Sequence, residues 1–551
     1  MSSRQILVTS ALPYVNGHVH LGHLVEYVQS DIWVRFQRLR GHEVRHFCAD
    51  DTHGTATMIR ARQEGREPEA LLAEMSAAHQ RDFADMDIRF DHYGSTHSPS
   101  NRRLVNEIWA ALRAGGHVTS REVTQLYDPQ AGAFLADRFV RGSCPRCKSP
   151  GQYGDNCEVC GAVYAPDELI DPLSTLSGAR PVKKSAPHFF VRLEDFRPFL
   201  REWTQAPGRL PPETANWLAG TFLGEPLRDW DVSRPAPYFG FEIPDAPGHY
   251  FYVWVDAPVG YMSATWDWCE RTGEDYARWW RNPDCEIHHF IGKDIAYFHT
   301  LFWPAMLKAS GHPLPHQVHV HGFLTVNGEK MSKRKGTFVL ARTYLDHLAP
   351  DYLRYYYASK LSGAVTDLDL ALGEFVAKVN ADLVGKLVNL ASRTARFVEG
   401  EALVDPRADD GGLFARGADA SEELAAAYEA GDTNRVTRVV MALADRANEY
   451  VEAKAPWSLR KQEGRRDELL RVCSASLNVF HQLALYLAPI LPRIAGEARA
   501  LLGAGADFRW EDSRTPLVGT RVAPFRHLLP RVDPAKVQAI VDASAAPAAE
   551  E

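Results

Sequence analysis

Four of the eight cysteines in this 551-residue chain stand close together, and they constrain the local fold more than any other feature. They form two Cys-x-x-Cys pairs, Cys144 with Cys147 and Cys157 with Cys160, with nine residues between the pairs. This spacing is typical of one zinc ion held tetrahedrally by four thiolates. Because four thiolates close the coordination sphere, the predicted zinc is structural and takes no part in catalysis.

The composition narrows the class of protein further. The other four cysteines are scattered, which suits a reducing compartment better than a disulfide framework. The sequence has neither the roughly 18 consecutive apolar residues of a membrane span nor an N-terminal secretory signal, so we expect a cytoplasmic protein with no membrane partner. The formal net charge is -8, so any nucleic acid must be held by local patches of the surface.

The order of predicted elements indicates an α/β fold. Ile6–Ser10 is a short β-branched run, and after a loop the apolar residues recur at helical spacing from Leu24 to Leu39. Further strands are predicted at Val44–Cys48, Tyr250–Val255 and Ile287–Ile291, each followed by polar, Gly or Pro residues. Buried strands of this kind predict a Rossmann-type, doubly wound parallel sheet whose ligands lie at the carboxyl ends of the strands.

Two regions differ from this pattern. Residues 116–229 are rich in turns and carry the cysteine cluster, so we interpret them as an insertion into the sheet domain. After Asp351 helical periodicity replaces the strand pattern, which predicts a C-terminal helix bundle. The segment from Ser544 to Glu551 is small and acidic, and we expect it to be disordered.

His20-Leu21-Gly22-His23 follows the first predicted strand and opens the first helix. The two imidazoles are three positions apart and therefore share a helical face beside the positive end of the helix dipole, a place that suits phosphate. Gly22 lets a flat ring approach the backbone. By itself this pattern also fits two surface histidines. A zinc protease is disfavoured because its motif needs a spacing of four with a Glu between.

A second motif places four cations in six positions after a turn. It is Lys330-Met331-Ser332-Lys333-Arg334-Lys335-Gly336. The pattern predicts a mobile cationic loop, although an isolated basic cluster is often only a solvated charge run. Together with the histidine motif some three hundred residues earlier, it resembles the class I aminoacyl-tRNA synthetases. Arg334 departs from the Ser that this family usually has there, whereas Lys330 and Lys333 are kept.

The resemblance becomes specific in several other runs. Six further runs look like the methionyl-tRNA synthetase family. They are Leu12-Pro13-Tyr14, Asp50-Asp51, Tyr252 to Pro258, Gly260-Tyr261-Met262, His289 to Asp294 and Ala455-Pro456-Trp457. The resemblance implies a Rossmann catalytic domain in two halves (1–115 and 230–325), a connective domain with the zinc knuckle (116–229), a stem-contact region with the lysine loop (326–380), a helical anticodon-binding domain (381–535) and a tail (536–551).

The resemblance also implies a methionine pocket, and physical chemistry agrees with its membership. A thioether suits polarizable aromatic walls, and a buried carboxylate such as Asp51 is tolerable when the substrate ammonium pairs with it. Trp254 and Tyr261 would otherwise be read as ordinary core residues. The implied pocket residues are Leu12, Tyr14, Asp51, Trp254, Ala257, Pro258, Tyr261, Ile295 and His299.

The implied reaction has two steps. Methionine attacks the α-phosphorus of ATP to give methionyl-adenylate and pyrophosphate, and the amino acid is then transferred to the 3′-terminal adenosine of tRNA(Met), releasing AMP. Charge that develops on the phosphate during the first step can be stabilised by His20, His23, Lys330, Lys333 and Mg²⁺, with Gly22 beneath the nucleotide. Both initiator and elongator tRNA(Met) are implied partners. Homocysteine is expected to be cleared in the synthetic site, since we see no separate editing domain.

For the tRNA, Asn389 and Arg393 lie four residues apart on one helical face, and Trp457 follows a proline at a helix start or bend. An indole can stack on an unpaired base while Asn and Arg bond its polar edge. The resemblance assigns these residues to the first anticodon base, cytosine. Gly385 departs from the Asn of many relatives at this position. Asn389 and Arg393 could also be plain helix surface.

Three other classes fit less well. Synthetases for isoleucine, valine and leucine carry a large editing insertion for which 551 residues leave no room. A nucleotidyltransferase with a His-x-Gly-His motif has no use for the helix bundle or the zinc insertion, and a zinc-knuckle RNA-binding module does not need Asp51, Lys333 and an α/β core. With no sign of an additional dimer-forming domain, we expect a monomer.

Overall fold

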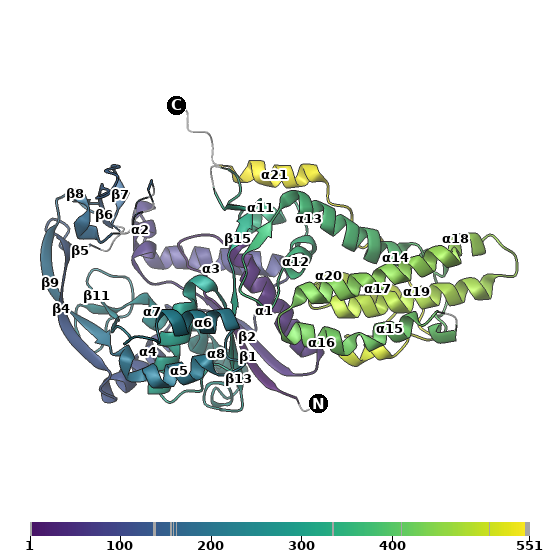
Figure 1. The fold of residues 1–551 in the computed structure, drawn as a ribbon, viewed down its shortest axis with the longest axis horizontal. Coiled ribbons are helices and arrows are strands. Elements are labelled where there is room, and N and C mark those ends of the chain that lie inside the picture. The colour runs from purple at the N-terminus through teal and green to yellow at the C-terminus, as the bar shows by residue number, and fades with distance from the viewer. Residues whose placement is uncertain are drawn as a thin grey trace.

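The computed structural model describes residues 3–135, 139–154, 157, 159–160, 162, 164–332, 335–408, 410–505 and 507–545. Along the long axis of the molecule, a long β-ribbon lies at one end, an α/β region at the centre and a helix bundle at the other end (Figure 1). Within the described residues, no helix combines the length and the apolar character needed to cross a bilayer.

The central sheet has five parallel strands in the order β14-β13-β1-β2-β3. Its strands are β1 (Gln5–Ser10), β2 (Glu43–Asp50), β3 (His92–Ser95), β13 (Glu286–Gly292) and β14 (Gln317–His321). The helices of this region are α1 (Leu21–Leu39), α2 (Thr55–Gln63), α3 (Pro68–Asp85), α4 (Pro99–Ala114), α7 (Val253–Asp256), α8 (Val259–Thr272), α9 (Ala277–Trp280) and α10 (Trp303–Ala309). The strand order reverses direction at β1, as in a doubly wound fold, so the prediction of a Rossmann-type parallel sheet is confirmed.

The register brings the carboxyl ends of three strands together. Thr9 of β1 pairs with His289 of β13 on one side and with Phe47 of β2 on the other. The loop before α1, the Asp50-Asp51 pair and the turn after Gly292 therefore leave the sheet at the same edge. This is the edge at which ligands of open α/β sheets bind.

The predicted strand at Tyr250–Val255 is wrong in its extent and its pairing. Only β12 (His249–Phe251) is extended, and it pairs antiparallel with β11 (Ser233–Pro235) outside the central sheet. The chain then turns into helix α7. A short apolar run does not distinguish a strand from a buried helical turn by periodicity, and here the packing of α7 against α4 and α8 decided for the helix.

The inserted region carries two small sheets. A twisted antiparallel ribbon is formed in the order β10-β9-β4-β5, and the cysteine cluster accompanies a second sheet in the order β7-β6-β8. The strands are β4 (Val118–Asp128), β5 (Ala133–Phe134), β6 (Val140–Ser143), β7 (Gln152–Tyr153), β8 (Ile170–Ser174), β9 (Val182–Val191) and β10 (Trp230–Asp231), with helices α5 (Arg197–Gln205) and α6 (Pro212–Thr221). The cysteine sheet has only a small core of its own, centred on Val140.

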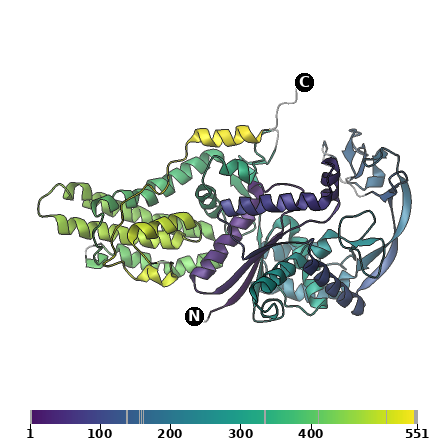
Figure 2. The ribbon, with the colours of Figure 1, turned by 180° about the vertical axis from the view of Figure 1, so that it is seen from behind.

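The region after β14 begins with a three-stranded sheet and continues as helices. Strands β15 (Leu324–Val326), β16 (Glu329–Lys330) and β17 (Leu368–Leu370) make that sheet, and β17 was not expected from the sequence. The helices are α11 (Ala341–Leu345), α12 (Pro350–Ala358), α13 (Leu372–Val379), the π-helix η6 (Asn380–Val388), α14 (Asn389–Ser392), α15 (Leu413–Asp419), α16 (Ser421–Glu429), α17 (Thr433–Lys454), α18 (Pro456–Leu459), α19 (Arg466–Leu487) and α20 (Pro492–Leu502). The predicted C-terminal helix bundle is confirmed. Seen from behind, α1 lies between the sheet and the bundle (Figure 2), and it packs on both α12 and α16.

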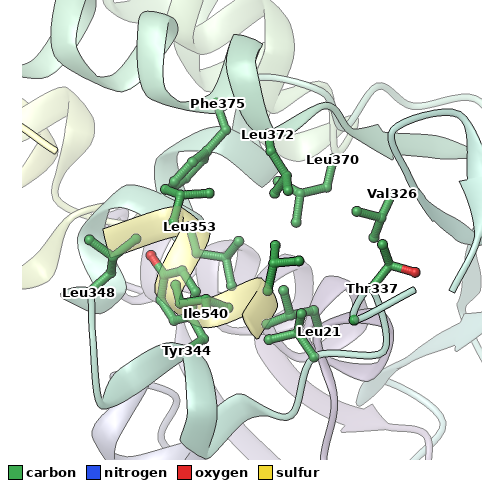
Figure 3. Close-up of a pocket in the computed structure, with 14 residues that line it drawn as sticks. Leu21, Val326, Thr337, Tyr344, Leu348, Leu353, Leu370, Leu372, Phe375 and Ile540 are labelled. Atoms are coloured by element: carbon green, nitrogen blue, oxygen red, sulfur yellow. The ribbon is translucent and has the colours of Figure 1, made fainter. Parts of the chain in front are cut away.

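The last helix of the described residues was not predicted from the sequence. Helix α21 (Pro534–Ser544) folds back onto α11 and α13, so the expected tail at 536–551 begins inside a helix, while residues 546–551 lie outside the described part. Ile540 packs with Leu21 and Tyr344 around an apolar cavity of about 20 Å³ (Figure 3). A cavity of this size holds about one water molecule, so it is a packing seam rather than a ligand site.

Candidate functional site

The two histidines of the first motif cap helix α1. His20 is the N-cap residue, and its Nδ1 accepts from the His23 N–H at 3.3 Å, while His23 Nδ1 accepts from the His20 N–H at 3.4 Å. The two rings stack with their centroids 3.6 Å apart. Because both Nδ1 atoms accept, each neutral ring carries its proton on Nε2. The motif therefore presents two fixed Nε2–H donors.

The surroundings keep both rings uncharged. Burial lowers the pKa of His20 to about 4. Burial also lowers the pKa of His23, and the neighbouring His20 adds to that shift. His23 is nevertheless solvent-exposed, so its ring lies in a concavity that is lined by protein and open to water. The site thus offers neutral donors to an anion.

Part of the predicted backbone anion site is already used. The Leu21 N–H donates to the Val339 carbonyl at 3.0 Å, and the Leu24 N–H donates to the His20 carbonyl at 3.2 Å. With the His23 N–H also bonded, most of the first turn is satisfied within the protein. Binding of an anion here therefore depends more on the imidazole Nε2–H groups, and less on backbone N–H groups, than the sequence suggested.

The lysine loop lies directly against this helix start. A Cβ added to Gly22 would stand 2.7 Å from Met331 Cε and 3.0 Å from the His20 ring, so the loop packs where only glycine leaves room. The segment after the loop is bridged to the chain before α1 at Leu340 and His20, and the Ala341 N–H donates to the Val19 carbonyl at 2.9 Å. These contacts join two motifs that are about three hundred residues apart in sequence.

The basic residues of the loop are placed as follows. Lys330 is exposed at the end of β16, which forms a hairpin with β15, and Lys335 pairs with Glu329. The loop is closed by the Thr337 N–H, which donates to the Ser332 carbonyl at 3.0 Å. Lys333 and Arg334, which the sequence singled out, lie outside the described residues.

The predicted methionine pocket contains a hydrogen-bonded pair. Tyr261 Oη and His299 Nε2 are 2.8 Å apart, and His299 Nδ1 lies 3.1 Å from the Ile295 carbonyl. Burial lowers the pKa of His299 to about 4, so the ring is neutral. Because Nδ1–H donates to the carbonyl, Nε2 accepts from the Tyr261 hydroxyl. The pair is thereby locked in one orientation.

The apolar walls come from three elements of the sheet region. Trp254 stacks on Phe298 with centroids 3.9 Å apart and meets His299 edge-on. A Cβ added to Gly260 would stand 2.8 Å from Leu12 Cδ1, so the Leu12 side chain packs directly against the start of α8. Ala257 is buried, and Pro258 is the N-cap residue of α8 beside it. Leu12, Trp254 and Tyr261 thus reach one place from distant parts of the chain.

Asp51 is a carboxylate without a charged partner. Its Oδ1 is buried and has no hydrogen-bond partner among the described residues, whereas the neighbouring Asp50 accepts from Tyr93 at 2.6 Å and from His79 at 2.7 Å. Burial raises the pKa of Asp51, and the nearby Asp256 and Asp50 raise it further. The backbone of Asp51 is bridged to Tyr14, the pocket residue across from it. A bound cation would pair with the Asp51 carboxylate and so offset the cost of shielding its charge from water.

Sequence reasoning missed a chain of polar residues behind Tyr14. The Tyr14 hydroxyl donates to the His53 carbonyl, the His53 ring contacts the buried carboxylate of Asp256, and His53 Nε2 lies 2.9 Å from His97 Nδ1. One signal could have revealed Asp256, because it is the only acidic residue in the quoted run from Tyr252 to Pro258. This series of hydrogen-bonded side chains holds Tyr14 in place in the pocket wall.

Arg234 was missed as well. It lies over the Tyr252 ring at 3.9 Å and lines a cleft of about 560 Å³ together with Tyr14 and Tyr238. The cleft lies between the catalytic edge of the sheet and the inserted ribbon, which contributes Leu126 and other residues. No local pattern around Arg234 distinguishes it from a surface arginine, so no sequence signal was available.

The four cysteines come together as predicted from their spacing. Their sulfur atoms all lie within 4.8 Å of one another, with Cys144 Sγ 3.8 Å from Cys160 Sγ and Cys147 Sγ 3.5 Å from Cys157 Sγ. Backbone N–H groups of Arg146 and Cys147 point at Cys144 Sγ, at 3.3 and 3.4 Å. This arrangement can hold a tetrahedral metal ion.

The predicted anticodon residues lie near one another on the bundle. The Arg393 guanidinium is 4.5 Å from the Trp457 ring centroid and also pairs with Glu452. Asn389, one turn earlier, donates to the Asn448 side chain at 3.4 Å. Gly385, one of the departures, lies in η6, where an added Cβ would be 3.3 Å from the Asn380 carbonyl. A side chain there would require a small shift.

The comparisons with known proteins agree with this geometry. Residues 6–395 match the family model described as tRNA synthetases class I (M), so fold and site define a class I tRNA synthetase. A methionine–tRNA ligase of Sorangium cellulosum is 61% identical over 538 residues, covering 98% of this chain and 78% of that protein. One of Rhodopirellula baltica is 58% identical over 549 residues, covering 100% of this chain and 81% of that protein.

The solved structures point the same way. A methionyl-tRNA synthetase of Mycobacterium tuberculosis in complex with methionyl-adenylate superposes with a TM-score of 0.80 at 26% identity, covering 96% of this chain and all of that one. This chain belongs to the methionyl-tRNA synthetase family. It activates methionine with ATP, forming pyrophosphate and later AMP, and charges tRNA with the amino acid.

Proposed function

We propose that the first reaction step takes place between the start of α1 and the lysine loop. The observation that carries this proposal is the contact of Met331 with Gly22, which puts the loop beside His20 and His23. ATP would lie over Gly22, with the two Nε2–H donors directed at its phosphates and Lys330 and Lys333 approaching from the loop. Charge that builds up on the phosphate in the transition state is then met by donors that are already in place.

Within this site the chain's residues bind and orient, and the substrates react with each other. The methionine carboxylate attacks the α-phosphorus and pyrophosphate leaves. Mg²⁺, bound with ATP, supplies positive charge next to the phosphate oxygens. We assign Lys333 to the transition state rather than to ground-state binding, because a loop lysine that closes late contributes most when the charge develops.

We assign methionine to the pocket of Leu12, Tyr14, Trp254, Ala257, Pro258, Tyr261, Ile295 and His299, with its ammonium on Asp51. The support is that Asp51 Oδ1 is buried without a partner while the neighbouring walls are aromatic. Pocket fit separates side chains that differ by one methylene by only about 1 to 3 kcal/mol. Homocysteine therefore enters, and its removal as the thiolactone in the same site is part of this proposal.

We assign Asn389, Arg393 and Trp457 to the first anticodon base of tRNA(Met), in both initiator and elongator forms. Trp457 is half-buried beside Arg393, a position from which the ring can stack on an unpaired base. Arg393 would exchange Glu452 for the edge of the base. The proposed contact of these three residues with the first anticodon base requires no side chain at Gly385.

We assign one structural zinc ion to Cys144, Cys147, Cys157 and Cys160. With Zn–S bonds of about 2.3 Å, a tetrahedral site needs sulfur atoms about 3.8 Å apart. The two sulfur separations of 3.8 and 3.5 Å fit this requirement. The zinc ion would supply the cohesion that the small core around Val140 lacks. The enzyme acts as a cytoplasmic monomer in this proposal.

The test of the first step is amino-acid-dependent exchange of pyrophosphate into ATP with all twenty amino acids. Methionine alone should support rapid exchange. Lys333→Ala should lower the exchange rate by a factor of about 10² or more while the dissociation constants of ATP and methionine change little. If this variant instead loses ground-state affinity with its maximal rate intact, the role assigned to Lys333 is wrong. Lys461→Ala, on the distant bundle, serves as the matched control.

A further inference from the structure

At the edge of the central sheet opposite the catalytic site, several imidazoles meet a carboxylate. Glu286 and His288 stand at the start of β13, and His316 directly precedes β14, which pairs with β13 in parallel. One ligand atom of each of these three residues lies within 4.8 Å of the others. None of them belongs to the methionine, ATP or tRNA sites described above.

We propose that Glu286, His288 and His316 form a second metal site, for a divalent ion of the late first transition row such as Zn²⁺ or Ni²⁺. Two imidazoles and one carboxylate are a donor set that these ions prefer, whereas Ca²⁺ and Mg²⁺ prefer oxygen ligands alone. Three protein ligands leave at least one coordination position for water.

The orientation of His288 supports this site. Its Nδ1 is 3.1 Å from His319 Nε2, and its Nε2 is 3.5 Å from Glu286 Oε2. Both contacts are hydrogen bonds, and because the Glu286 carboxylate can only accept, Nε2–H donates to it in the ion-free protein. A metal ion between Nε2 and Glu286 would replace this proton, and Nδ1–H would then donate to His319. Metal-binding histidines are commonly held in this way, with the second ring nitrogen donating to a neighbour.

The rings around His288 prevent it from turning. Trp33 of α1 lies 4.6 Å from the His288 ring, and His319 stacks on Phe290 at 4.2 Å. The His288 ring is therefore held in place before any ion arrives.

The carboxylate is held as well. Arg4 donates to both oxygens of Glu286, with Nη2 at 2.5 Å from Oε2, and its Nη1 pairs with Glu429 of α16 at 2.9 Å. A carboxylate has about four acceptor positions, so the bonds from Arg4 leave room for a metal ion on the other side. Arg4 would then orient the ligand from outside the coordination shell, and through Glu429 the site is connected to the bundle.

His316 provides the way in. Its side chain is exposed, while that of His288 is 2% exposed and that of Glu286 is 23% exposed. The ligand atoms must close from as much as 4.8 Å to the roughly 3.3 Å that metal–nitrogen bonds of about 2.0 Å imply. A rotation of the exposed His316 ring can supply most of this movement, because it is the least packed of the three.

The experiment uses untagged full-length protein whose four-cysteine site has first been filled with one equivalent of Zn²⁺. Equilibrium dialysis against Ni²⁺, followed by metal analysis, should find one additional ion per chain. Co²⁺ in place of Ni²⁺ should give visible d–d bands. His316→Ala should weaken Ni²⁺ binding at least tenfold and leave methionine-dependent exchange unchanged. His527→Ala, an exposed histidine elsewhere, is the matched control.

Three results would overturn the proposal. The first is that the zinc-filled wild-type protein binds no Ni²⁺. The second is that His316→Ala binds Ni²⁺ as tightly as the wild type, and the third is that His527→Ala loses binding to the same degree. A thermal midpoint measured with and without Ni²⁺ adds an independent readout, since an ion bound only to the folded state raises it in the wild type and not in His316→Ala.

Discussion

The proposed methionine pocket and the proposed anticodon surface would prepare for their ligands in opposite ways. In the pocket, Asp51 is half-buried, and its Oδ1 is shielded from water without a hydrogen-bond partner among the described residues, so the cost of removing water from that oxygen has been met during folding. On the bundle, Arg393 already pairs with Glu452, and Asn389 with Asn448. Methionine would therefore complete its proposed site, whereas RNA would have to displace partners that the protein supplies. Substitutions should accordingly have larger effects in the pocket than on the surface.

The largest effect is expected for Asp51→Asn. The change removes the proposed partner of the substrate ammonium, and breaking a buried ion pair costs about 3 to 5 kcal/mol. This corresponds to a loss of roughly 10² to 10⁴ in kcat/KM for methionine in the exchange assay. Asp284→Asn, an exposed change, should have no effect.

A methionine analogue without the amino group sharpens this result. The wild-type protein should discriminate strongly against the analogue, and Asp51→Asn should discriminate much less. Equal discrimination by the two proteins would show that Asp51 does not bind the ammonium.

On the bundle, Trp457→Ala should lower aminoacylation of tRNA by a factor of about 10 to 100. Stacking of a base on an aromatic ring contributes about 1 to 3 kcal/mol. Methionine-dependent pyrophosphate exchange should stay nearly unchanged, because the first step does not use the bundle. Trp217→Ala, at an exposed tryptophan of the inserted region, is the control. A parallel loss in both assays would contradict the assignment.

Acid should affect the pocket through His299. Its pKa is about 4 in the folded protein and about 6.5 in the unfolded chain. As pH falls below about 6.5, the unfolded state takes up the proton first, so this contribution to stability is complete above pH 6.5 and is lost toward pH 4. The slope is at most about 1.4 kcal/mol per pH unit.

The measurement compares thermal midpoints of the wild type and His299→Gln at pH 7.5 and 5.5. The wild type should lose more stability between the two pH values, because the glutamine does not titrate. If the midpoints of both proteins fall by the same amount, His299 is not held neutral by the pocket.

The smallest effect is expected for Glu452→Gln, and it should be a gain. Removing the charge frees Arg393 for RNA, and exposed ion pairs are worth about 0.2 to 1 kcal/mol. We expect tRNA to bind up to about fivefold more tightly at moderate salt. Glu449→Gln, on the same helix α17, should leave binding unchanged. Weaker binding in Glu452→Gln would mean that Glu452 positions Arg393 rather than competing for it.

Much of the fold was predictable because periodicity is local. Strands β1, β2 and β13, helix α1 and the bundle follow from runs of apolar residues, and the parallel order follows from strands with polar ends. Strand β17 and helix α21 were not foreseen, since each is stabilised by distant segments: β17 by β15, and α21 by α11 and α13. The run at Tyr250–Val255 was misassigned for the same reason.

The functional groups also divide into those placed by local spacing and those placed by contacts between distant segments. The capping by His20 and His23 and the gathering of the four cysteines depend on spacings of a few residues, and backbone geometry converts such spacings directly into positions. The contact of His53 with Asp256 spans 203 residues, and that of Met331 with Gly22 spans about three hundred. The sequence by itself determined which groups this protein carries. Which of them meet was decided by tertiary packing, because strand order and burial, rather than spacing, bring distant residues together.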